Sequence, residues 1–263
     1  QISEEYLIYL SSRSEWELSR AKWLKLFSCQ RDPVSFPWDQ ASNICLPALA
    51  IACIQFQARA IEALLPPKNI VKAYPVGKEM TDLEIAERVS RHMDYQLMFK
   101  MTEFEESMDV SLMQLPIEGS AFRKTYYDPI KGRNVSDYVD ADDFVVNYHT
   151  RRLEDAQRYT HVIRKSLNEI KRLGEKRIFI NTEEFKEGSV LTSNVIKEQS
   201  DKTQGIVSTG NDKTNIRELL EQHTWLDIDN DGIKEPVVVT VDNETHKVLR
   251  IVSRTNPETG ELI

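Results

Sequence analysis

The longest apolar run in the chain reads SNICLPALAIACIQFQARAIEALLPP, from Ser42 to Pro67. Pro47 suits the first helical position and a proline pair closes the far end, so the run predicts one helix of about five turns. Apolar side chains cover most of its circumference, which predicts a helix buried on several sides. A membrane span is the rival interpretation, but Arg59 and Glu62 would each cost about 2–3 kcal/mol at the centre of a bilayer. We therefore expect no membrane.

The few polar residues of this helix are ordered. Gln55, Arg59 and Glu62 fall at i, i+4 and i+7 and so form one narrow stripe along the helix. A polar stripe on an otherwise apolar helix indicates contact with a polar partner, and we take it as a candidate contact site.

Composition bounds the class of protein. With 263 residues, 40% of them hydrophobic, the chain is large enough to bury a real core. Its net charge of -8 argues against a protein that coats nucleic acid with its whole surface, although a local basic patch stays possible. Cys45 and Cys53 lie about 12 Å apart on one helix, too far to bridge, and a reducing compartment is expected. Because the first residue is Gln1 rather than Met, we expect a piece of a longer protein.

The residues before the central helix and most of those between it and Leu115 show a helical pattern. Residues 3–28 are amphipathic and contain neither glycine nor proline. Asn69–Val76 alternates and predicts a short edge strand. The capping box that starts at Thr81 then opens a helix whose apolar stripe continues without a break to Leu115.

From Gly119 the hydrophobic period changes to two. Ala121–Tyr127 and Asn134–Val139 predict a hairpin, and Asp143–Tyr148 predicts a further strand. A second capping box at Ser166 starts a short helix that stops at Gly174. Three strands at 219–226, 236–241 and 247–253 predict a C-terminal meander.

These patterns predict an α+β fold, with long amphipathic helices packed against antiparallel hairpins and a meander. The expected subdivision is a mainly helical layer over 1–118, a β hairpin plus short helix over 119–174, a polar loop-rich insert over 175–217, and a β meander over 218–263.

The most specific local motif is the acidic loop DIDNDGIKE, from Asp227 to Glu235. Its spacing offers four carboxylates to a hard cation such as calcium: Asp227, Asp229, Asp231 and Glu235. The twelfth position of an EF-hand is occupied by Val238, so the complete cage of that motif is missing. The alternative is an Asx-rich turn whose carboxylates accept their own backbone amides. A metal-dependent hydrolase built from Asp142, Asp143 and this loop is a third reading.

No motif for catalysis or nucleotide binding is present in the sequence. Walker-type, GxGxxG and GxSxG runs are missing, and the five histidines show no zinc spacing. We therefore predict no enzyme, no catalytic or cofactor-binding residue, and no cofactor besides the calcium that the acidic loop offers to hold.

Three blocks of sequence carry a resemblance to a known family. The first comprises WDQASNI (38–44), ALLPP (63–67) and VKAYPVG (71–77). The second comprises GSAFRKTYYDP (119–129) and VDADDFVVN (139–147). The third comprises WLDIDNDGIKEPVVVT (225–240) and VLRI (248–251). Together they are similar to the portal, or head-to-tail connector, proteins of tailed double-stranded DNA bacteriophages.

The resemblance implies a wing-region fragment of a ring that has about twelve subunits in the full-length protein. It implies as partners the other portal subunits, terminase, coat and tail-adaptor proteins, and double-stranded DNA that passes through the channel during packaging and ejection. It places the protein at the capsid vertex of the virion, and in the host cytoplasm during assembly. The stem, clip and crown of the family have no counterpart in this sequence. Under this interpretation, the Gln55, Arg59 and Glu62 stripe meets the polar edge of the β layer or a neighbouring subunit.

Overall fold

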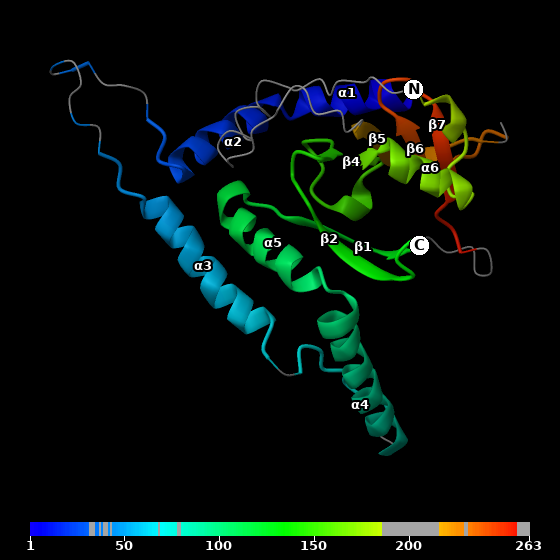
Figure 1. Cartoon of the computed structure of the whole chain (residues 1–263), viewed down its shortest axis with the longest axis horizontal. Coiled ribbons are helices and arrows are strands. Elements are labelled where there is room, and N and C mark those ends of the chain that lie inside the picture. The colour runs from blue at the N-terminus through cyan, green and yellow to red at the C-terminus, as the bar shows by residue number, and fades with distance from the viewer. Residues whose placement is uncertain are drawn as a thin grey trace. The chain divides into compact units, whose positions relative to one another are not determined.

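The computed structural model describes residues 1–31, 35–36, 38, 42, 44–67, 69–77, 80–185, 216–228 and 231–256. Its contacts divide the chain into two units (Figure 1). The sheet unit comprises Gln1–Ala21 and Asp142–Ile263, and the helical unit comprises Lys22–Ala141. The predicted α+β fold is confirmed. The N-terminal helix groups with the C-terminal sheet, which the expected order of layers along the chain did not anticipate.

The sheet unit is built on five antiparallel strands in the order β3-β4-β5-β6-β7. Their bounds are Phe144–Val146, Tyr159–Ser166, Ile216–Leu226, Glu235–Asp242 and Val248–Ser253. The predicted strand near 143–148 and the C-terminal meander are therefore confirmed. Strand β4 was not predicted, because its sequence YTHVIRKS places only Thr160 and Val162 in the core, and the rest is polar or half-buried.

The two faces of this sheet are covered by different helices. Helix α6, Leu167–Glu175, packs Ile170 on one face, where Leu219 and Leu249 complete a buried cluster. On the other face Val239 and its neighbours contact Ile2 of helix α1, Ile2–Ser12. The start of α6 follows the predicted capping box, since the Ser166 hydroxyl accepts from the Glu169 amide and the Glu169 carboxylate accepts from the Ser166 amide.

The helical unit has a small core between α3 and α5. Helix α3 spans Ala48–Leu64 and runs beside α5, Phe104–Glu118 (Figure 1). Their shared cluster contains Cys53 and Ile117, together with Leu24 of helix α2, Ser14–Phe27. The predicted hairpin is confirmed as strands β1 and β2, Phe122–Asp128 and Arg133–Val139, in antiparallel register. In its turn the Asp128 carboxylate accepts the Ile130 amide at 2.7 Å.

The predicted continuous helix from Thr81 to Leu115 is wrong. Helix α4 spans Met80–Tyr95, a π-helical turn follows over Gln96–Lys100, and the chain leaves helical geometry at Met101 before α5 begins. Met101 is only 5% exposed, and Glu103 forms a two-pronged pair with Arg133. That pair lowers the pKa of the Glu103 carboxyl. Burial and an ion pair at the break thus replace the helical hydrogen bonds that a straight helix would have kept.

The edge strand predicted at Asn69–Val76 is also wrong. The segment is extended, but its amides donate to side chains of α4 in place of a neighbouring strand. Val71 donates to the Asp94 carboxylate and Ala73 donates to the Ser90 hydroxyl, both at 2.8 Å. Because a helix satisfies these donors, no sheet ladder forms.

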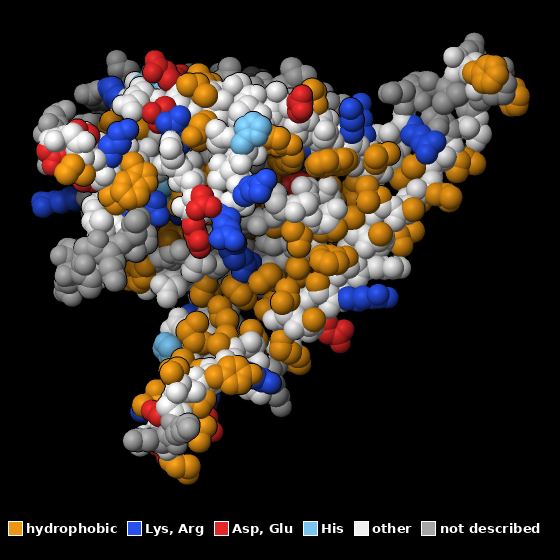
Figure 2. Space-filling model, turned by 180° about the vertical axis from the view of Figure 1, so that it is seen from behind, with side chains coloured by type: hydrophobic (Ala, Val, Ile, Leu, Met, Phe, Trp, Pro, Cys, Tyr) orange, Lys and Arg blue, Asp and Glu red, His pale blue; other side chains and the backbone are white. Residues whose placement is uncertain are grey.

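The expected burial of α3 on several sides is wrong as well, although the helix itself lies where the sequence placed it. Within α3 only Cys53 is buried, and five large apolar side chains are 37–51% exposed. Figure 2 shows hydrophobic side chains along α3 and α4 on the face that it views. Within the part of the chain that the structure describes, most of the apolar circumference of α3 is therefore left exposed. Among the described residues, no helix combines the length and apolar character that a membrane crossing needs.

Candidate functional site

The acidic loop lies between β5 and β6 at the edge of the meander. Ligand oxygens of Asp227, Asp231 and Glu235 all lie within 4.8 Å of one another, as the sequence spacing predicted. Asp229 falls outside the described residues. Gly232 has a φ of 90°, a conformation that a side chain rarely adopts, and this lets the loop turn back into β6.

Each of the three carboxylates also accepts a backbone amide from the loop. Gly232 donates to Asp227 at 3.0 Å, Ile228 to Glu235 at 3.1 Å and Ile233 to Asp231 at 2.7 Å. These bonds are what the Asx-turn alternative expected. They do not exhaust the carboxylates, since each ionised group has about four lone-pair sites. Three like charges this close repel one another, and a bound hard cation would relieve that repulsion.

The polar stripe of α3 lies on the side of the helix away from its core. Gln55, Arg59 and Glu62 are all exposed in the part of the chain that the structure describes. The polar residue that α3 turns toward its neighbour is Gln57, whose amide donates to the Asp109 carboxylate of α5 at 2.6 Å. Contact of the stripe with the polar edge of the β layer or with a neighbouring subunit stays a prediction.

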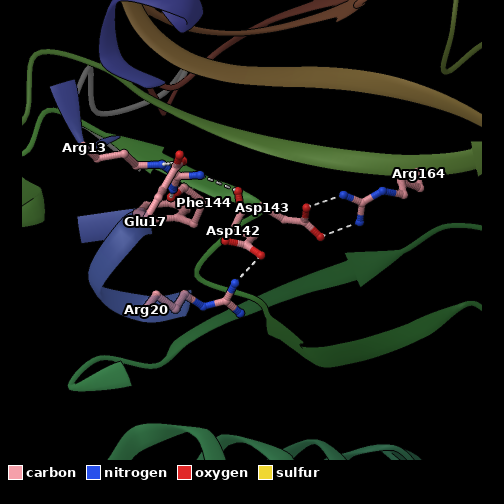
Figure 3. Close-up of polar contacts among 7 residues, drawn as sticks. All are labelled: Arg13, Glu17, Arg20, Asp142, Asp143, Phe144 and Arg164. Atoms are coloured by element: carbon pink, nitrogen blue, oxygen red, sulfur yellow. Dashed lines mark hydrogen bonds and ion pairs between the residues drawn. The ribbon is translucent and has the colours of Figure 1, made fainter. Parts of the chain in front are cut away.

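A cluster of buried arginines, drawn in Figure 3, was missed by sequence reasoning. Arg13 lies between α1 and α2 and is 7% exposed. Its guanidinium contacts the Glu17 carboxylate at 2.9 Å and donates to the carbonyls of Phe144 and Asp142 at 2.9 and 2.8 Å. Arg13 thus ties the helices to the start of β3 through a fork of directed bonds.

The neighbouring carboxylates are engaged by two further arginines. Arg20 of α2, 1% exposed, pairs with Asp142. Arg164 of β4 binds both oxygens of Asp143, at 2.6 and 2.5 Å (Figure 3). Its Nε also lies 3.4 Å from Glu218. The hydrolase hypothesis required Asp142 and Asp143 as metal ligands, but arginine guanidinium groups bind both carboxylates. The arrangement is one of structural ion pairs.

The helical half of this cluster could have been predicted from the sequence. Arg13, Glu17 and Arg20 fall at i, i+4 and i+7, which places them on one side of a helical segment. Their partners at Asp142 and Phe144 lie more than 120 residues away, so no local pattern links the two halves.

Comparison with protein families supplies the decisive observation. The model of the Phage SU10 portal protein family matches residues 70–256, more than two thirds of the chain. The chain belongs to this portal family. No curated protein matches it.

The match locates the portal features along the chain. It runs from just before α4 to just after β7, and so contains the acidic loop and the Asp142–Asp143 pair. Helices α1, α2 and α3, with the polar stripe, precede it. Two of the three resembling blocks fall inside the matched range, and the first contributes only VKAYPVG. Members of this family have a structural role in the phage particle, and the family implies an oligomeric ring.

Proposed function

We propose that this chain is a wing segment of a phage portal ring, the vertex channel through which DNA is packaged and ejected. The single observation that carries the proposal is the portal family match over residues 70–256. Terminase, coat and tail-adaptor proteins are the proposed partners of the assembled ring, which resides in the virion and assembles in the host cytoplasm.

The composition of the chain supports this role. A channel component must let a polyanion move past without strong retention, and a net charge of -8 disfavours tight electrostatic binding of DNA. Two of the arginines, Arg13 and Arg20, are buried in ion pairs inside the sheet unit and so do not add to its positive surface. Packaging energy would then come from the terminase partner.

The test is the oligomeric state of the full-length parent protein. Electron microscopy and native mass spectrometry are expected to show closed rings of about twelve copies, as cyclic symmetry requires. A parent that stays monomeric at every concentration tested would overturn the proposal.

A second candidate function, a calcium-stabilised binding or adhesion module, is favoured by the convergence of Asp227, Asp231 and Glu235. Calcium that binds only the folded state at 100 times its dissociation constant stabilises by about 2.7 kcal/mol. Calcium is then expected to raise the melting temperature of the wild-type chain but not of Asp231→Asn, while Glu87→Gln on exposed α4 keeps the shift. If calcium does not shift the melting temperature of the wild-type chain, the loop is an Asx turn and not a calcium site.

A further inference from the structure

Two helices of the helical unit expose more apolar surface than their packing uses. In α3 and α4 together, only Cys53 and Ala86 are buried. The large apolar side chains left 37–78% exposed on these helices are Leu49, Ile51, Ile54, Phe56, Leu64, Met80, Leu83, Ile85, Val89, Met93 and Tyr95. Figure 2 shows such side chains on both helices.

On α4 the exposed residues form a ridge. Ile85, Val89 and Met93 follow one another at intervals of four and so lie in one row along the helix. The adjacent side of α4 is already in use, because Ser90 and Asp94 hold the extended segment at residues 71–73. Past that segment, the main contact of α4 is with the π-helical turn that continues it. The row, which we call the α4 ridge, stays 40–49% exposed among the described residues.

On α3 the exposed side carries a groove. It has a volume of about 430 Å³ and is lined by Ala52, Gln55, Phe56, Arg59 and Ala60. The two alanines let another helix approach closely, Phe56 offers an apolar wall, and Gln55 and Arg59 form a polar rim. Ridges of one helix pack into grooves of another at interaxial distances of about 8–10 Å. The apolar residues that line this α3 groove suit an apolar helical row.

We infer that the α4 ridge of one copy docks into the α3 groove of a second copy, head to tail, around the ring. This inference rests on the proposed portal function. Each copy carries one ridge and one groove, on helices that do not pack extensively against each other within the chain. Two different complementary faces on one subunit are what a heterologous contact requires, whereas a two-fold contact would use one face twice.

The exposed area agrees with a repeated contact between copies. An aliphatic side chain of four carbons carries on the order of 100 Å² of apolar surface, so eleven half-exposed side chains present roughly 550 Å² in total. These side chains lie on two helices that pack little against each other, so the total is divided between two faces and is not one contiguous patch. A standard interface buries about 800 Å² per partner. The helix pair thus supplies the apolar centre of a contact, and every subunit of a closed ring makes two of them.

Cross-linking of variants with one exposed cysteine tests the pairing. In a Cys29→Ser, Cys45→Ser background, which keeps the buried Cys53, Ala60→Cys is mixed with Val89→Cys and treated with a short bismaleimide. Docking raises the effective concentration of the two thiols, so the mixed dimer should form at least roughly tenfold faster than with Arg91→Cys, on the opposite side of α4. Equal rates for Val89→Cys and Arg91→Cys, or faster Ala60→Cys homodimers, would overturn the head-to-tail pairing. So would a cross-link formed within one chain carrying both Ala60→Cys and Val89→Cys.

Ring assembly of the full-length parent separates this inference from the portal function. Val89 is 46% exposed, so Val89→Glu should leave folding and melting unchanged while it abolishes rings; Arg91→Glu should keep them. Normal rings with Val89→Glu would contradict the contact between the α4 ridge and the α3 groove, but they would still support the proposed portal function. A wild-type parent that forms no ring would instead remove the proposed function itself.

Discussion

The two units of this chain handle their apolar surface in opposite ways. In the sheet unit, Ile170, Leu219 and Leu249 are 0% exposed, because strands and helix α6 share one cluster. In the helical unit, α3 buries a single residue and α4 another. A packed antiparallel sheet with a helix on each face can bury its apolar residues within one chain. A lone amphipathic helix cannot, and it needs a partner to cover its apolar face.

The units differ in their charges in the same sense. Arg20 in the sheet unit is 1% exposed and paired, whereas Arg91 and Glu87 on α4 form a pair that is 76% and 72% exposed. The helical unit also holds the mostly buried pair of Glu103 and Arg133, so charge alone does not separate the units. The exposed apolar rows of α3 and α4 are the surface that the proposed contact between copies would use.

The largest effect that tests this contrast is the loss of a buried ion pair. Arg20→Ala leaves Asp142 without its charged partner in a mostly buried site, so the free energy of unfolding should fall by about 3–5 kcal/mol. The exposed counterpart, Arg91→Ala, should cost no more than about 0.5 kcal/mol. Urea denaturation followed by circular dichroism measures both. Similar losses for the two variants would erase the distinction between the units.

An isoleucine-to-alanine substitution made once in each unit tests the difference in apolar burial. Ile170→Ala removes a side chain with 0% exposure and should destabilise by about 2–5 kcal/mol through lost burial and a cavity. Ile54→Ala on α3 removes one that is 51% exposed, and the change should stay below about 1 kcal/mol in the isolated chain. Thermal melts of the two variants, at equal concentration, make the comparison. An Ile54→Ala loss as large as that of Ile170→Ala would show that α3 is covered within the chain.

A smaller effect concerns pH and is confined to the sheet unit. Burial, followed by the charge of Glu218, raises the pKa of Tyr6 to about 12 from its ordinary 10.0. Below pH 10 both folded and unfolded chains keep the phenol neutral. Between pH 10 and 12 only the unfolded chain ionises, so stability falls as pH rises, by at most about 2.7 kcal/mol.

Tyr6→Phe should therefore flatten the decline of stability between pH 10 and pH 12 in urea titrations. Tyr95→Phe on α4 should leave the decline in place, because Tyr6 is still present. An unchanged slope in Tyr6→Phe would show that the Tyr6 hydroxyl is solvated in the folded chain.

Local patterns determined much of this protein. The hairpin at 122–139, the meander after Ile216, the capping box at Ser166 and the helix at 48–64 follow from hydrophobic period, turn residues and caps, all of which act over a few positions. The convergence of Asp227, Asp231 and Glu235 was predicted for the same reason, since one short loop carries all three. The motif blocks pointed to the portal family, which the family match confirms.

Only the tertiary structure decided the rest, because the deciding partners are remote in sequence. The break at Met101 depends on burial and on Arg133 across 30 residues, and the extended run at 71–73 depends on Ser90 and Asp94. The partner of Arg20 lies 122 residues away. The sequence predicted that α3 is apolar around most of its circumference, but it did not predict which side of the helix is buried. Burial is set by what packs against a helix, and among the described residues α5 packs on one side of α3 while the other side stays exposed.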